Sequence, residues 1–326
     1  MSQPYRVAFR RPGGPEVLEL ESLMLPPPAG LEVRIRHEAI GLNYIDTYHR
    51  SGLYPLPLPS GLGNEAAGTV EAVGEKVTEF QRGDRVGYFT GPLGAYASHR
   101  NVDCRLLVRL PDWLGAEQAA ATMLKGVTAE YLIERCAKVE SGQWVMVYAA
   151  VGGVGSIMLP WLKASGARII AYTGSEAKAQ LALSLGADHS LCGPLDGIAD
   201  EVLRLTNRHG AQVVFDGVGA ASWQTSLACV ARRGLIVSYG NASGPVPPFT
   251  ALDLLRAGSI FVTRPTLGDY APTPEAIRAS AARLFEMLKS KVVKVHIGAR
   301  FLLAEAEDAH RAIESRATTG STVLIP

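Results

Sequence analysis

The sequence contains few cysteines, and they lie far apart. Only four occur among 326 residues, at Cys104, Cys136, Cys192 and Cys229. This spacing argues against a disulfide framework and against a clustered metal site. We interpret most of these cysteines as small, buried hydrophobic side chains.

Long apolar runs and a surplus of one charge are also absent. No apolar run approaches the roughly 20 residues that cross a bilayer, and residues 1–6 lack the basic and then apolar segment of a secretory signal. We therefore expect a cytoplasmic protein with no membrane partner. The formal net charge is +1, so no overall field favours nucleic acid or an anionic lipid surface.

The length of the chain predicts two domains, because 326 residues can bury two sizeable cores. In the first part, short alternating segments lie between turns rich in glycine and proline. They predict strands at residues 5–9, 18–20, 32–40, 68–73 and 85–89. Many short strands of this kind indicate an antiparallel, barrel-like N-terminal domain.

After residues 118–121 the pattern changes to strands that alternate with helices. Nearly continuous apolar strands are predicted from residue 144 and at 168–173, 212–216, 234–239 and 259–262, with helices at 156–164, 177–184 and 197–207. This alternation indicates an α/β domain with a parallel sheet covered on both faces. A long amphipathic helix at 274–289 and a last strand at 322–325 follow, and we expect that strand to return to the first domain.

The strand that starts at residue 144 ends in a cluster of glycines, and a helical segment follows at once. Aligned on the dinucleotide fingerprint G-x-G-x-x-G, the turn reads Ala150-x-Gly152-x-x-Gly155, with alanine in place of the first glycine. Gly152 permits close approach of backbone to phosphate, and Gly155 permits close packing of helix on strand. Alone, the pattern also fits an ordinary tight turn. The next strand arrives after one crossover helix, which favours a dinucleotide whose pyrophosphate meets the helix N-terminus.

The end of the second parallel strand distinguishes the two nicotinamide cofactors. NAD sites usually carry an acid there for the ribose 2′-hydroxyl, whereas NADP sites supply a cation for the 2′-phosphate. Here the loop reads Thr173-Gly174-Ser175-Glu176-Ala177-Lys178. No acid closes the strand and Lys178 is near, so the loop favours NADPH. Two other interpretations stay open: Lys178 is a solvated surface lysine, and Glu176 only caps a helix.

Seven motifs occur in one order along the chain. They are residues 13–18 (GGPEVL), 41–48 (GLNYIDTY), 51–55 (SGLYP), 149–155 (AAVGGVG), 240–244 (GNASG), 263–265 (TRP) and 314–318 (ESRAT). With these motifs the chain resembles the NADPH-dependent quinone oxidoreductases, a zinc-free family that includes zeta-crystallin and belongs to the medium-chain dehydrogenase/reductase superfamily. The resemblance covers essentially the whole chain and is especially close to bacterial members.

The resemblance implies two domains with the active site in the cleft between them. Residues 1–124 and 263–326 would form a GroES-like, β-rich catalytic domain, and residues 125–262 a Rossmann NADPH-binding domain with a doubly wound parallel sheet. Asn43 and Thr128 would lie near the nicotinamide. The other implied cofactor contacts are Gly152, Gly153 and Val154 at the pyrophosphate, Gly174, Ser175 and Lys178 at the adenosine ribose and its 2′-phosphate, and Tyr239, Asn241, Val262, Thr263 and Arg316. The family often places a tyrosine near the 2′-phosphate where this chain aligns Gly193, so the NADPH preference rests more on Lys178.

Three positions bear on zinc. Asn43 stands where zinc-dependent relatives offer a catalytic cysteine, and Asn64 where they offer the histidine of a Gly-His-Glu triplet. Neutral amides are poor zinc ligands compared with thiolate and imidazole. A structural zinc would need four close cysteines, and residues 91–108 contain only Cys104. We therefore expect no zinc site.

The expected reaction follows from the missing metal ligands. An alcohol dehydrogenase needs a Lewis acid for the developing alkoxide, whereas a quinone spreads the incoming charge over its ring. We therefore expect zinc-independent reduction of a small-molecule quinone by NADPH, with positioning as the main source of catalysis. Asn43, Tyr48 and Tyr54 are the expected catalytic residues, which stack on the quinone or hydrogen-bond its oxygens. Tyrosines in loops rich in glycine and proline are also often packing residues.

Two other functions stay open. Zinc-free relatives share this cofactor geometry and reduce activated C=C bonds in enones. Some family members bind RNA or serve as structural proteins of the lens, although a near-neutral chain without a basic and aromatic stripe gives RNA binding little support. The strands at 234–239 and 259–262 are candidates for a sheet edge, which relatives pair, so we expect a homodimer.

Overall fold

The computed structural model describes residues 3–315 and 318–326, and it divides into two compact units. The β-rich unit comprises Met1–Val127, Ala271–Leu284 and Val295–Pro326, and the parallel-sheet unit comprises Thr128–Tyr270 and Phe285–Lys294. The predicted domains assign residues 263–270 and 285–294 to the catalytic domain, whereas in the structure these residues belong to the parallel-sheet unit. Tyr270 stacks on Tyr131 of that unit at 4.7 Å between ring centroids, which accounts for the first difference. The predicted boundaries themselves remain a proposal.

The β-rich unit is built mostly from short strands. Its strands are β1 (Tyr5–Phe9), β2 (Glu19–Ser22), β3 (Glu32–Leu42), β4 (Ser60–Gly61), β5 (Glu65–Val73), β6 (Arg85–Tyr88), β7 (His99–Asp103), β8 (Val108–Arg109), β15 (Ile297–Leu302) and β16 (Ser321–Ile325). Its α-helices are α1 (Tyr44–Ser51), α10 (Ala306–Glu314) and the first parts of α2 (Ala116–Glu130) and α9 (Pro274–Lys289), with single 3-10 turns at Pro15–Val17, Cys104–Leu106 and Leu303–Glu305.

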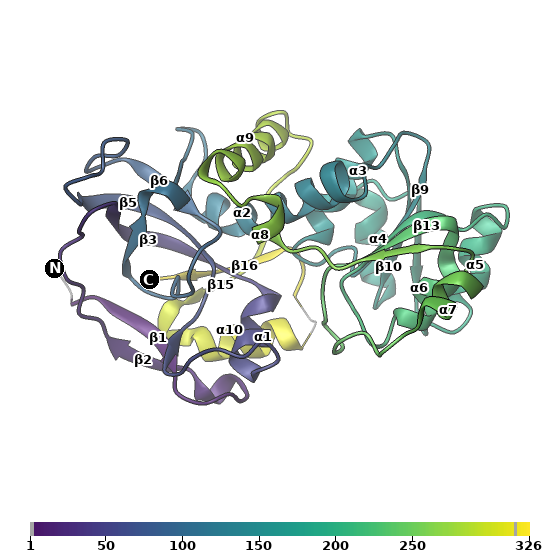
Figure 1. Ribbon diagram of the computed structural model, residues 1–326, viewed down its shortest axis with the longest axis horizontal. Coiled ribbons are helices and arrows are strands. Elements are labelled where there is room, and N and C mark those ends of the chain that lie inside the picture. The colour runs from purple at the N-terminus through teal and green to yellow at the C-terminus, as the bar shows by residue number, and fades with distance from the viewer. Residues whose placement is uncertain (1–2, 316–317) are drawn as a thin grey trace. The chain divides into compact units, whose positions relative to one another are not determined.

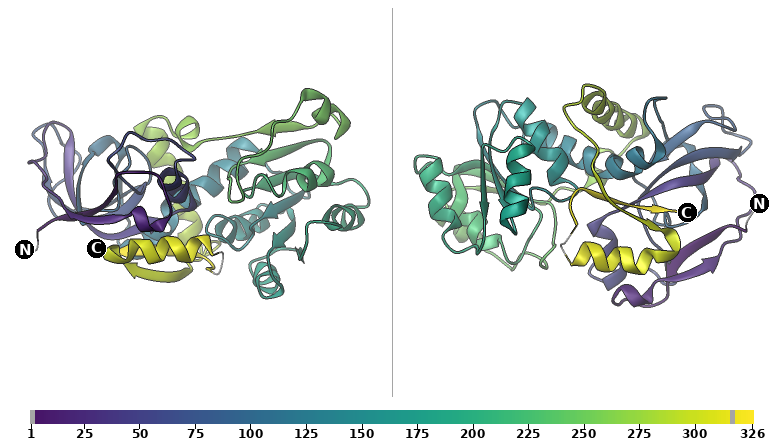
Figure 2. Two further views of the ribbon diagram at one scale, coloured as in Figure 1. Left: turned by 90° about the horizontal axis from the view of Figure 1, so that it is seen from below. Right: turned by 180° about the vertical axis from the view of Figure 1, so that it is seen from behind.

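The strands of this unit form two sheets. The larger has the order β15-β16-β3-β5-β6-β8, with β7 also paired to β3, and the smaller has the order β2-β1-β4. Strand β16 pairs antiparallel with β3, which confirms the expected return of the C-terminal strand. In Figure 2 the yellow C-terminal strands run beside the purple N-terminal ones. The core between the sheets includes Phe9, Ile35, Tyr88 and Tyr96, all nearly or fully buried.

The parallel-sheet unit alternates strands and helices. Its strands are β9 (Trp144–Tyr148), β10 (Arg168–Thr173), β11 (His189–Cys192), β12 (Ala211–Asp216), β13 (Val230–Ser238) and β14 (Phe261–Thr263), and its helices are a π-helical stretch (Tyr131–Cys136), α3 (Gly155–Ala164), α4 (Glu176–Ser184), α5 (Ile198–Leu205), α6 (Trp223–Cys229), α7 (Ala251–Arg256) and α8 (Leu267–Tyr270). The strands are all parallel in the order β11-β10-β9-β12-β13-β14. In chain order this is 3-2-1-4-5-6, the Rossmann arrangement. Helices α3 and α4 cover one face and α5 and α6 the other (Figure 1).

The sequence pattern missed several short elements. Helix α1 was expected as a loop, yet Tyr48 is helical and only 8% exposed. Gly52 ends the helix, because its φ of 83° is the left-handed conformation of a helix C-cap. Hydrogen bonds of Asp46 and Arg50 to residues distant in the sequence also stabilise the helix. Strands β11 and β15 were also missed, because both are short and partly exposed edge strands. None of the helices in the described part of the chain has the length and apolar character that a bilayer crossing requires.

Candidate functional site

The turn between β9 and α3 has the backbone of a dinucleotide-binding turn. The amide of Gly152 donates to the carbonyl of Ala149 at 2.9 Å, and the amide of Ser156 donates to the carbonyl of Gly152 at 2.8 Å. A Cβ at Gly155 would lie 2.6 Å from the carbonyl oxygen of Ala149, so only glycine fits where the helix starts against the strand. Ala149 has φ 50°, a left-handed conformation that costs an alanine about 1 kcal/mol relative to glycine.

The loop between β10 and α4 presents hydroxyl groups and a helix N-terminus. Ser175 is the N-cap of α4, and its Oγ accepts a hydrogen bond from the amide of Lys178 at 3.4 Å. The carboxylate of Glu176 accepts bonds from the side chains of Gln180 at 3.0 Å and Cys192 at 3.2 Å. Both of its oxygens therefore have partners within the unit.

The ends of β12 and β13 are held together by a buried carboxylate. Asp216 is 1% exposed and accepts hydrogen bonds from the hydroxyls of Ser222 and Ser226, each at 2.7 Å, and from the amides of its own turn. Its carbonyl accepts the amide of Tyr239 at 2.8 Å. These contacts place Tyr239 and Asn241 directly beyond the carboxyl end of β13.

The predicted cofactor residues of this unit gather at one edge of its sheet. Parallel strands present their carboxyl ends at the same edge, and ligands bind where the strand order reverses, here between β9 and β12. Residues at or just beyond these ends are Gly152, Gly153, Val154, Gly174, Ser175, Tyr239, Asn241, Val262 and Thr263. Lys178 lies in the first turn of α4 and Thr128 within α2. Arg316, also predicted, lies outside the described residues.

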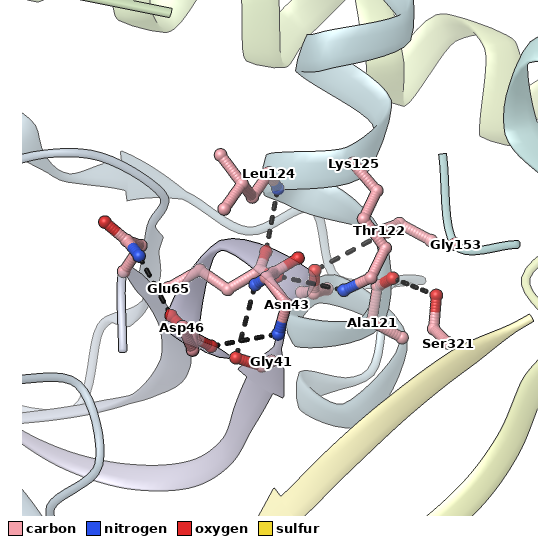
Figure 3. Close-up of polar contacts among 12 residues, drawn as sticks. Gly41, Asn43, Asp46, Glu65, Ala121, Thr122, Leu124, Lys125, Gly153 and Ser321 are labelled. Atoms are coloured by element: carbon pink, nitrogen blue, oxygen red, sulfur yellow. Dashed lines mark hydrogen bonds and ion pairs between the residues drawn. The ribbon is translucent and has the colours of Figure 1, made fainter. Parts of the chain in front are cut away.

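Asn43, at the junction of β3 and α1, forms the centre of a second cluster in the β-rich unit (Figure 3). Its amide nitrogen donates to Oε1 of Glu65 at 2.7 Å and to the carbonyl of Gly41 at 3.3 Å. Glu65 is fully buried. Its carboxylate also accepts the backbone amide of Leu124 at 2.7 Å and the ammonium of Lys125 at 3.2 Å.

Asp46 is a second fully buried carboxylate beside Asn43. It accepts the backbone amide of Asn43 at 2.9 Å, the hydroxyl of Tyr96 at 3.0 Å and the side-chain amide of Asn64 at 3.0 Å. Burial raises the pKa of Asp46 to about 7, although these three hydrogen bonds act in the opposite direction. Asp46 therefore ties the start of α1 to two other segments of the unit.

A chain of hydrogen bonds continues from Asp46 to the C-terminal helix α10. Arg50 donates to Nδ1 of His310 at 2.9 Å and to Glu314 at 2.5 Å. Because arginine only donates, Nδ1 of His310 accepts and Nε2 carries the proton toward the hydroxyl of Tyr96, 3.1 Å away. Burial, followed by the charge of Arg50, lowers the pKa of His310 to about 3, so this histidine stays neutral.

The two predicted substrate tyrosines belong to one aromatic cluster. Tyr48 packs edge-on against Tyr44 at 5.6 Å and against Tyr54 at 5.3 Å between ring centroids. The amide of Tyr54 donates to the carbonyl of Tyr48 at 3.0 Å. The structure thus brings Tyr48 and Tyr54 together on α1 and the turn that follows it.

The residues at the zinc positions do not fit zinc. Asn43 and Asn64 both turn their amide N–H groups toward carboxylates, so each acts there as a donor rather than as a metal ligand. Among residues 3–315 and 318–326, no three histidine, cysteine, aspartate or glutamate side chains are grouped to hold a metal ion.

Sequence reasoning did not single out several members of the β-rich cluster. Asp46, Tyr96, Lys125 and His310 were not named as site residues, and Glu65 was noted only as part of a triplet. One signal was available for Glu65, which is an acid followed by the small residues Ala66, Ala67 and Gly68. An acid in such a segment is buried only where hydrogen-bond donors surround it, so its presence indicates a cluster of buried polar groups.

Comparison with known proteins agrees with this architecture. Residues 29–135 match the family described as "Alcohol dehydrogenase GroES-like domain", and residues 153–284 match the one described as "Zinc-binding dehydrogenase". The second match does not include Asn43 or Asn64, so it carries no information on the catalytic zinc positions.

Three individual proteins are similar over nearly the whole chain. A quinone oxidoreductase of Pseudomonas aeruginosa is 50% identical over 98% of this chain and 99% of its own length. The structure of an Escherichia coli quinone oxidoreductase complexed with NADPH has 42% identity and a TM-score of 0.95, covering 99% of this chain and 100% of that one. A 2-haloacrylate reductase of a Burkholderia species is 39% identical over 98% of both chains.

We expect Gly155→Ala to destabilise the protein, because its new Cβ would lie 2.6 Å from backbone atoms of Ala149 and Ala150. The loss should be about 1–3 kcal/mol in the free energy of unfolding, measured by urea denaturation. Gly174→Ala is the matched control, since its Cβ would meet no atom within 4 Å. Equal stability of the two variants would contradict the close packing of α3 on β9.

Replacing Asp46 should change how stability depends on pH. The folded chain keeps the proton of this carboxyl up to about pH 7, whereas the ordinary pKa is 3.8. The folded state thus binds more protons between these values, and the free energy of unfolding falls as pH rises through them. Asp46→Asn does not titrate, so wild type should lose stability relative to this variant between about pH 5 and pH 7.5.

Urea denaturation of both proteins at the two pH values measures this difference. Asp103→Asn serves as the control, because a hydrogen bond from Arg105 lowers the pKa of Asp103 and keeps its titration below this range. If wild type instead gained stability over Asp46→Asn at the higher pH, burial would not be the dominant influence on Asp46.

Proposed function

Because the chain belongs to the quinone oxidoreductase family, we propose that it uses NADPH to reduce a small quinone. The protein is an NADPH-dependent oxidoreductase, so the proposal concerns its electron acceptor. The observation that carries it is the pair of amides at Asn43 and Asn64, whose N–H groups bind carboxylates. This donor set offers no Lewis acid for an alkoxide, which an alcohol substrate needs and a quinone does not.

We further propose which residues hold NADPH, which supplies the reducing equivalents when bound. The amides of Gly152, Gly153 and Val154, at the start of α3, would bind the pyrophosphate. Gly174, Ser175 and Lys178 would bind the adenosine ribose and its 2′-phosphate, a role supported by the lack of an acid at the end of β10, where residues 173–175 are Thr, Gly and Ser. The remaining contacts would come from Asn43, Thr128, Tyr239, Asn241, Val262, Thr263 and Arg316.

Tyr48 and Tyr54 would form the substrate side. A quinone is flat, and the edge-on pair of tyrosine rings, 5.3 Å apart, offers it an aromatic surface. Positioning of the acceptor against the nicotinamide then supplies most of the catalysis.

A second acceptor class has specific support. The 2-haloacrylate reductase that is 39% identical to this chain is named for a substrate with an activated C=C bond. Enones share with quinones a conjugated system that accepts charge without a metal ion. We therefore keep reduction of activated C=C bonds as the second candidate function.

A panel of acceptors tests the proposed function. NADPH oxidation should be faster with 1,4-benzoquinone than with an α,β-unsaturated ketone, and Tyr54→Ala should lower kcat/KM for the quinone roughly tenfold by loss of ring contact. The KM for NADPH should not change. Leu53→Ala, in the same turn and 38% exposed, is the control. Unchanged turnover by Tyr54→Ala would remove Tyr54 from the site, and faster reduction of the enone would favour the second candidate.

We also propose that the protein is a homodimer. Strand β14 is at the end of the strand order and pairs only with β13 among the strands of its sheet. Large apolar side chains near this edge are exposed: Phe249 by 42%, Leu252 by 58%, Leu255 by 64% and Phe261 by 61%. A second copy, related by a two-fold axis, would cover both the open edge and these side chains.

Size-exclusion chromatography with light scattering tests the dimer. Wild type should have about twice the 34.7 kDa mass of one chain. Phe261→Lys should shift the protein toward the mass of a single chain, because it places a charge in the interface. Met24→Lys is the control, because Met24 is 90% exposed in the other unit. A wild type with the mass of one chain at micromolar concentration would contradict the proposal.

A further inference from the structure

The amide of Asn43 has a defined orientation. Its nitrogen lies 2.7 Å from Oε1 of Glu65 and 3.3 Å from the carbonyl oxygen of Gly41. A carboxylate and a carbonyl only accept hydrogen bonds, so the amide must turn its nitrogen, not its oxygen, toward them. Both N–H donors of Asn43 are therefore used within the protein.

Glu65 cannot easily turn away to release these donors. It is fully buried at the start of β5, where its other oxygen accepts the backbone amide of Leu124 at 2.7 Å. The ammonium of Lys125, itself 5% exposed, lies 3.2 Å from the oxygen that also binds Asn43. Separating this pair would leave a buried charge without its partner, which is strongly unfavourable.

We propose that Glu65 is a positioning residue that fixes the polarity of the Asn43 amide, so that Asn43 meets its ligand only as a hydrogen-bond acceptor. This inference rests on the proposed function, which places Asn43 at the nicotinamide end of NADPH. An oxidised quinone offers only acceptor oxygens, whereas the cofactor offers ribose hydroxyls and carboxamide N–H groups. Under this proposal Asn43 binds the cofactor rather than the quinone oxygens.

An exchange of donor and acceptor between the two residues tests this proposal. In Glu65→Gln the oxygen of the glutamine should stay on the backbone amide of Leu124, because helix α2 holds that donor in place. Its NH₂ group then faces the NH₂ of Asn43, so the Asn43 amide turns and presents N–H groups to the ligand. In the double variant Asn43→Asp with Glu65→Gln, the new glutamine donates to the new aspartate. The second oxygen of that aspartate then faces the ligand as an acceptor again, and the total charge is unchanged.

The Kd of NADPH, measured by fluorescence titration, is the main readout, with KM for NADPH and for 1,4-benzoquinone beside it. Glu65→Gln should weaken NADPH binding roughly tenfold, the scale of one hydrogen bond, and should leave the KM for quinone unchanged. The double variant should regain most of this affinity. Glu71→Gln is the matched control, because Glu71 lies on the same strand and its side chain is 32% exposed.

Two cofactor analogues identify the donor. If the carboxamide is bound, Glu65→Gln should not weaken binding of the reduced 3-acetylpyridine analogue, which lacks the amide hydrogens. If a ribose hydroxyl is bound, Glu65→Gln should not weaken binding of the analogue that lacks the 2′-hydroxyl on the nicotinamide ribose. Each result supports the proposal and names the source, whereas weakening with both analogues overturns it.

Two other outcomes overturn the inference while leaving the proposed function intact. One is a Glu65→Gln variant that binds NADPH as wild type does. The other is a double variant that stays as defective as Glu65→Gln, in binding or in folding, in which case Glu65 has only a structural role. Failure of the proposed function looks different, because wild type itself would then bind NADPH without reducing the quinone.

Discussion

Two buried carboxylates hold together the site of the β-rich unit. Glu65 and Asp46 are both fully buried, and each buried carboxyl group needs several hydrogen-bond partners to offset the loss of water. Their donors come from the start of α1, from α2 and from the segments around Asn64 and Tyr96. Because these segments are far apart in the sequence, the need to satisfy two carboxylates fixes where Asn43 lies.

The parallel-sheet unit positions its site by different means. Its turns present backbone amides, and their shape depends on small residues where strand and helix meet, above all Gly155. Asp216 then ties the ends of β12 and β13 with hydrogen bonds from its own turn and from α6. Backbone amides at a helix start suit the phosphates of a dinucleotide.

The side-chain amides of Asn43 and Asn64 serve as hydrogen-bond donors to the neighbouring carboxyl groups. Each amide donates to one of the two buried acids, so the polar groups satisfy one another. A cluster of this kind gives a fixed pattern of donors and acceptors rather than an electrophilic metal centre. That pattern is consistent with an oxidoreductase whose acceptor needs orientation more than activation.

The sequence alone determined five of the six parallel strands, the glycine turn and the loop after β10, because each depends on residues close together in the chain. It could not determine that Tyr48 is helical or which groups surround Asn43. Glu65 binds residues 22, 59 and 60 positions away, and Arg50 binds one 264 positions away. Only the tertiary structure brings these partners together, since a local pattern carries no information on which distant donor will meet a buried acid.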